Sequence, residues 1–75
     1  MSYHNAQLGL DIFQVFKLEV DPCVGILLDD LVTKVQRLGQ RQQRIFTDDE
    51  IIDEVSSLVD TGLVTKDGNR YKWFR

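Results

Sequence analysis

The residue types that carry most enzyme chemistry are scarce and isolated in this sequence. There is one histidine, His4, and one cysteine, Cys23. A cysteine nucleophile needs a base beside it, and no histidine lies near Cys23 in the sequence, so we expect Cys23 to be a small buried residue. The carboxylates between 48 and 54 lack the alternating spacing and the turn glycine of a calcium-binding loop. We predict no enzymatic activity, no catalytic residue, no bound metal or cofactor, and no small-molecule substrate.

Acidic residues gather in one segment, 47–61, which contains six acids and no base. Part of this charge suits the first turn of a helix, where the helix dipole favours anions. The acids further along have no such explanation. An acidic helix face is repelled by the phosphates of DNA, and it complements a basic protein surface. We therefore expect an outward, partner-binding face formed by Asp49, Asp53, Glu54 and Asp60.

Basic residues gather on either side of the acidic segment. The stretch 34–44 has no acid and is rich in glutamine, which suits contacts with phosphates and base edges. It equally suits the solvated C-terminal end of a helix, where cations are favoured. If these bases lie beside those of 62–75 in the folded chain, together they form a patch that can bind nucleic acid. The candidate residues are Arg37, Arg41, Arg44, Lys66, Arg70 and Lys72.

The acidic segment has helix signals at both ends. Thr47 and Glu50 have the spacing of a capping box, in which each side chain bonds to the other residue's backbone N–H. Apolar residues then recur at helical spacing. Gly62 follows them and suits a left-handed C-terminal residue. These signals predict a helix over 47–61.

The last segment has the pattern of a β-hairpin. Asp67-Gly68 lies between two runs rich in β-forming residues, and such a dipeptide is a strong signal for a tight hairpin turn. The pattern predicts a hairpin over 63–74. We expect the aromatic side chains of its second half to pack on the preceding helix. These are Tyr71, Trp73 and Phe74.

The first half of the chain has weaker signals. Asp21-Pro22 suits an N-cap followed by a first-turn proline, and Gly39 suits a helix end. With the apolar spacing between them, they predict a helix over 22–38. The segment 6–20 fits two patterns, because its apolar residues have helical spacing while 16–20 alternates as a strand does. We favour a helix there.

The order helix, helix, helix and hairpin is that of a winged helix-turn-helix domain. Two segments carry a closer resemblance, Glu54-Val55-Ser56-Ser57-Leu58-Val59-Asp60-Thr61-Gly62-Leu63-Val64 and Lys66-Asp67-Gly68-Asn69-Arg70-Tyr71. They resemble the end of the third helix and the wing of bacterial winged-helix repressors of the MarR and PadR types. In DNA-binding members, the resemblance implies a third helix in the major groove and a wing on the backbone. Other winged helices are protein–protein modules. The predicted fold is α+β, a small single winged-helix domain over 1–75.

Resemblance and charge together lead to two functional hypotheses. The first is a non-enzymatic protein-interaction or regulatory module whose acidic third helix contacts a basic partner, within nucleic-acid-handling machinery. The alternative is a small DNA-binding transcriptional regulator that uses the basic 34–44 segment and the wing. Both allow a homodimer. No run approaches the ~18 apolar residues of a membrane span, and the N-terminus lacks a signal-peptide pattern. We therefore expect no membrane contact and a cytoplasmic location.

Overall fold

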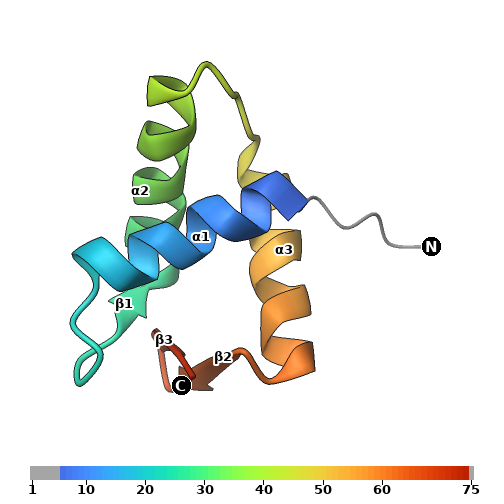
Figure 1. Ribbon diagram of the computed structural model, residues 1–75. Coiled ribbons are helices and arrows are strands. Elements are labelled where there is room, and N and C mark those ends of the chain that lie inside the picture. Colours follow the sequence, from blue (N-terminus) through green and yellow to red (C-terminus); the bar gives the residue numbers. More distant parts are fainter. Residues whose placement is uncertain (1–5, 75) are drawn as a thin grey trace.

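Within residues 6–74, which the computed structural model describes, three helices pack against a three-stranded antiparallel sheet (Figure 1). The elements are α1 (Ala6–Glu19), β1 (Ile26–Leu27), α2 (Leu28–Arg41), α3 (Asp48–Thr61), β2 (Val64–Asp67) and β3 (Arg70–Trp73). The first segment is thus a helix, and the fold is of the α+β class. None of the three helices combines the length and the hydropathy that crossing a bilayer requires.

Helix α3 has the ends that its sequence predicts. The Thr47 hydroxyl accepts a hydrogen bond from the Glu50 backbone N–H at 3.2 Å, and the Glu50 carboxylate accepts one from the Thr47 N–H at 2.9 Å. The capping box is therefore confirmed. At the other end Gly62 has a φ of 86°, and the Leu63 N–H donates to the Leu58 carbonyl at 3.0 Å. These bonds satisfy backbone groups that helix ends otherwise leave without partners.

The second helix starts later than its sequence predicts, so the range 22–38 is wrong. Asp21 caps a tight turn instead of a helix. Its carboxylate accepts a hydrogen bond from the Cys23 N–H at 2.8 Å, and its carbonyl accepts one from the Gly25 N–H at 2.8 Å. Asp and Asn bind their own following backbone in this way, which makes them common in turns as well as at N-caps.

Strand β1 occupies residues that were expected to be helical. Gly25 has a φ of 80°, which an α-helix cannot continue through. The chain then extends, and β1 pairs antiparallel with β3, Ile26 opposite Tyr71 and Leu27 opposite Arg70. A two-residue strand has no stability of its own. Its existence therefore depends on a partner strand more than forty residues further along the chain.

Gly39 does not end α2, which continues to Arg41. It lies buried inside the helix because the loop that follows folds back against it. A Cβ atom built on Gly39 would lie 3.2 Å from Phe46 Cδ2 and 3.0 Å from the Arg44 carbonyl oxygen. Glycine therefore allows the loop to approach α2 closely, and Phe46 is buried there.

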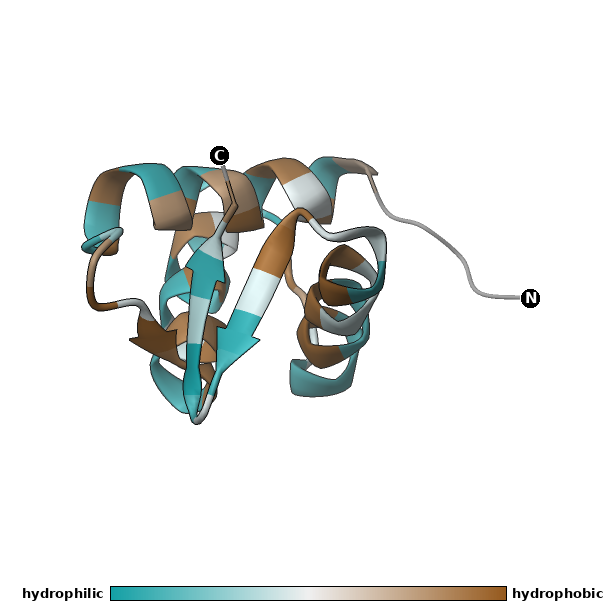
Figure 2. Ribbon diagram, turned by 90° about the horizontal axis from the view of Figure 1, so that it is seen from below, coloured by the Kyte–Doolittle hydropathy of each residue, from teal (hydrophilic) through white to brown (hydrophobic). Residues whose placement is uncertain are grey.

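The sheet has the order β1-β3-β2, so β3 is the central strand. Figure 2 shows the hairpin from below, with the C-terminal end of β3 beside α1 and the hairpin tip pointing away from it. All three helices, β1 and β2 contribute buried side chains to one core. Its apolar members are Leu8, Ile12, Val15, Phe16, Ile26, Leu31, Val32, Val35, Phe46, Ile51, Val55, Leu58 and Val64.

Substitution of Gly25 tests the close contact between the α1–β1 turn and β3. We expect Gly25→Ala to lower the free energy of unfolding by about 2–4 kcal/mol, because an L-residue is strained at positive φ and its Cβ would lie 2.8 Å from the Tyr71 carbonyl oxygen. Gly68→Ala is the matched control, since Gly68 has a φ of 63° but open space around it. We expect the control to cost about 1 kcal/mol. Urea unfolding measures both, and equal losses would contradict the contact.

Candidate functional site

The acids at the start of α3 are engaged in the structure. Glu50 belongs to the capping box. The Asp48 carboxylate accepts a hydrogen bond from the side-chain amide of Gln36 on α2. Both carboxylates also lie in the first turn, where the helix dipole stabilises negative charge. These two acids therefore help to hold α3 in place.

Glu54 does not belong to the outward face of α3, and the prediction that placed it there is wrong. Its side chain is buried, with 5 % of its surface exposed. The reason is its position, three residues after Ile51 and four before Leu58, both of which face the core. Residues at these spacings share one side of a helix. The apolar spacing of the sequence already contains this signal.

Three acids of α3 remain on its exposed side, Asp49, Asp53 and Asp60. Within residues 6–74, none of the three has an ion pair or a side-chain hydrogen bond. Ile52 lies beside them on the helix, three residues after Asp49, and is 37 % exposed. This acidic face of α3 (Asp49, Asp53 and Asp60) therefore combines unpaired carboxylates with one accessible apolar side chain.

The candidate nucleic-acid residues fall into two separate groups. Arg37, Arg41 and Arg44 lie on the C-terminal half of α2 and the loop after it, whereas the hairpin carries the three others. Arg70 is opposite Leu27, directly before the N-terminus of α2. Helix α2 has 14 residues, and at a rise of ~1.5 Å per residue it is about 20 Å long. The two groups lie at opposite ends of α2 (Figure 1), so they do not form one patch.

Arg44 has a structural contact. Its guanidinium lies 3.6 Å from the carboxylate of Asp11, which is buried in α1. The Arg44 side chain also donates to the side chain of Gln42. A buried carboxylate needs a compensating charge or hydrogen bonds. Arg44 therefore joins the loop after α2 to α1, a role that its place in a basic segment does not indicate.

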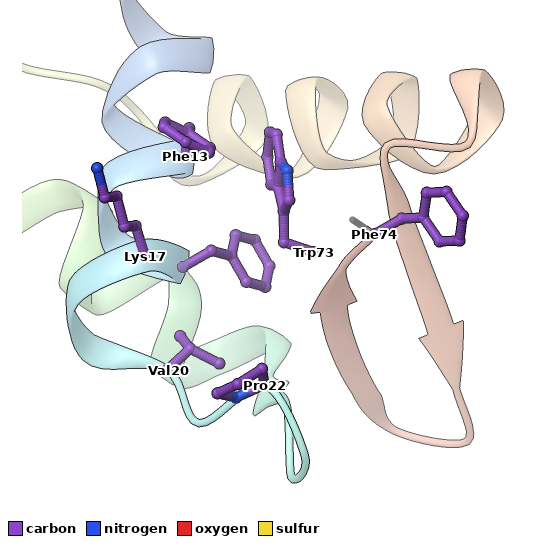
Figure 3. A pocket seen from close by; sticks show the side chains of 7 residues that line it. Phe13, Lys17, Val20, Pro22, Trp73 and Phe74 are labelled. Atoms are coloured by element: carbon purple, nitrogen blue, oxygen red, sulfur yellow. The ribbon is translucent and has the colours of Figure 1, made fainter.

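An apolar pocket lies between α1, the α1–β1 turn and the end of β3 (Figure 3). It has a volume of about 530 Å³. The Trp73 ring contacts α1, edge-on to Phe13 at 4.9 Å between ring centres and tilted against Phe16 at 5.7 Å. The expectation that Trp73 packs on the third helix is wrong, because the central strand ends beside α1. Phe74, the next residue, is 60 % exposed.

Within residues 6–74, the residues considered for catalysis or metal binding are not assembled into a site. Cys23 is exposed in the α1–β1 turn, so the expectation that it is buried is wrong. His4 lies outside the described residues. Among residues 6–74, no group of three His, Cys, Asp or Glu side chains is close enough to hold a metal ion. The surfaces that stand out are therefore the acidic face of α3 and the aromatic pocket.

Comparison of the chain with protein-family models, with curated proteins and with solved structures gives no match in any of the three.

The contact between Arg44 and Asp11 leads to a stability prediction. We expect Arg44→Ala to lower the free energy of unfolding by about 1–3 kcal/mol, because it leaves the Asp11 carboxylate buried without its cation. Arg41→Ala is the matched control, since Arg41 is exposed and has no ion pair within residues 6–74. We expect the control to change stability by less than about 0.5 kcal/mol. Thermal or urea unfolding of both variants is the measurement, and equal effects would contradict the structural role.

Proposed function

We propose that this protein is a non-enzymatic winged-helix module that binds a protein partner through the acidic face of α3. The winged-helix assignment is supported by the order of the helices and by the C-terminal hairpin. It is also supported by α2 and α3 following each other along the chain, with the loop 42–47 between them. The partner surface is basic, because charged surfaces that associate are complementary.

One observation carries the proposal. Of the six acids of α3, Asp48 and Glu50 form hydrogen bonds at its N-terminus and Glu54 is buried. Asp49, which also lies in the first turn, Asp53 and Asp60 are exposed and have no partner within residues 6–74. The helix has no base to balance them. A face of this kind opposes the phosphates of DNA and attracts Lys and Arg side chains.

Charge reversal on this face tests the proposal. We expect the immobilised chain to retain a basic protein from an extract of its source cells. The double variant Asp49→Lys/Asp53→Lys should not retain this protein. Asp29→Lys/Asp30→Lys is the matched control, because it makes the same charge change at an exposed part of α2. The affinity of the isolated pair should fall as salt is raised, since surface charges are screened.

If neither double variant retains the protein, binding depends on the overall charge of the chain, which would contradict the assignment to α3. Retention by both would show that α3 is not the contact. Circular dichroism of each variant excludes unfolding as the cause of a loss.

Binding to DNA distinguishes the proposed function from the alternative of a DNA-binding regulator. Because the two basic groups are separated, we expect fluorescence anisotropy to detect no binding to random duplex DNA at near-physiological salt. A complex whose affinity falls steeply with salt, and which weakens in Arg37→Ala/Arg41→Ala, would favour the DNA-binding alternative. Arg44 is left intact in this variant because of its contact with Asp11.

A further inference from the structure

The aromatic pocket has the properties of a binding site for an apolar side chain. Its volume of about 530 Å³ lies in the range of pockets that hold ligands, roughly 300–1,000 Å³. The Trp73 ring contacts the rings of both Phe13 and Phe16, so the pocket wall belongs to packed parts of α1 and β3. Val20 and Pro22 border its other side (Figure 3).

The surface around this pocket is apolar and exposed to solvent. Phe13 is 37 % exposed, Leu10 one turn before it on α1 is 56 % exposed, and Phe74 at the end of the hairpin is 60 % exposed. Single exposed apolar residues are ordinary, but a group beside a pocket marks a surface that another molecule covers.

The charge at the pocket indicates the chemistry of the occupant. Among residues 6–74, Lys17 is the one charged residue that lines it, and its ammonium group has no ion pair there. The nearest acids in sequence are engaged. Glu19 pairs with Lys34 at 3.2 Å, and the Asp21 carboxylate accepts the Cys23 N–H. The complementary occupant is an apolar side chain with a carboxylate beside it.

The acidic face of α3 presents this combination. Ile52 is 37 % exposed and lies three residues after Asp49, while Asp53 lies four residues after Asp49; both acids are exposed and without a partner within residues 6–74. Residues three and four apart lie on the same side of a helix. One copy of the chain therefore has an apolar pocket with an unpaired cation, and a helix face on which an exposed apolar side chain lies beside unpaired anions.

We propose that the aromatic pocket of one chain receives the Asp49–Asp53 face of α3 from a second copy, with Ile52 in the pocket and its neighbouring carboxylates at Lys17. This inference rests on the proposed function, because it gives the acidic face a partner surface that carries an unpaired cation, Lys17. The two surfaces are different, so the contact is head-to-tail. A head-to-tail contact leaves one free pocket and one free α3 face, and the assembly grows with concentration unless it closes into a ring.

Sedimentation velocity of the purified chain over a range of concentrations tests this contact. We expect the average mass of the wild type to rise with concentration, and to rise less at high salt. Lys17→Glu and Asp49→Lys/Asp53→Lys should each raise the apparent dissociation constant by at least about tenfold, because each places like charges together. Arg37→Glu is the matched control, an equal charge change at an exposed helix position away from the pocket, and should leave self-association unchanged.

Mixing the two charge variants gives the sharpest result. The Lys17→Glu chain keeps a normal α3 face, and the Asp49→Lys/Asp53→Lys chain keeps a normal pocket. At a concentration at which each variant alone is monomeric, an equimolar mixture should therefore form a complex of twice the monomer mass or larger. Mixing would not restore a symmetric contact between two α1 helices, so formation of the complex indicates a head-to-tail contact. Absence of the complex would overturn the proposal.

The remaining outcomes are also decisive. A wild-type chain that is monomeric at all concentrations overturns this inference but not the proposed function, which the capture experiment tests separately with another protein. Self-association that survives Lys17→Glu excludes the pocket as the binding site. Self-association that survives the α3 double variant excludes the acidic face.

Discussion

The antiparallel pairing of β1 with β3 is the contact on which the arrangement of the other parts depends. It joins the segment before α2 to the last strand of the chain, Ile26 opposite Tyr71, and makes β3 the central strand. As a consequence, the C-terminal end of β3 lies against α1, and Trp73 contacts Phe13 and Phe16. The turn before β1 also lies close to β3, and the residue at the contact, Gly25, has no room for a Cβ atom.

The same pairing determines how charge is distributed over the surface. Because β1 runs directly into α2, the hairpin bases are held near the N-terminus of that helix, while Arg37 and Arg41 lie on its C-terminal half. Opposite ends of a helix of 14 residues are too far apart to form one compact patch. The acids of α3, in contrast, lie on one helix and stay together at helical spacing.

The charged residues of this chain divide between structural and accessible roles, and sequence alone does not separate them. Arg44 neutralises the buried Asp11, although it belongs to a run of basic residues. Glu54 is buried, although it belongs to a run of acidic ones. The acids left exposed and unpaired on α3 within residues 6–74 are Asp49, Asp53 and Asp60. These three are better candidates for partner binding than the full set of six acids.

The parts of the fold that the sequence determined by itself are those held by contacts between near neighbours in the chain. The capping box of Thr47 and Glu50, the left-handed Gly62 and the Asp67-Gly68 turn each involve residues within a few positions of one another, so their spacing is visible in the sequence. Tertiary structure decided the rest. Strand β1, the later start of α2, the contact of Arg44 with Asp11 and the place of Trp73 on α1 all depend on partners far along the chain. A short segment such as 22–27 has little preference of its own, and the strand that pairs with it decides its conformation.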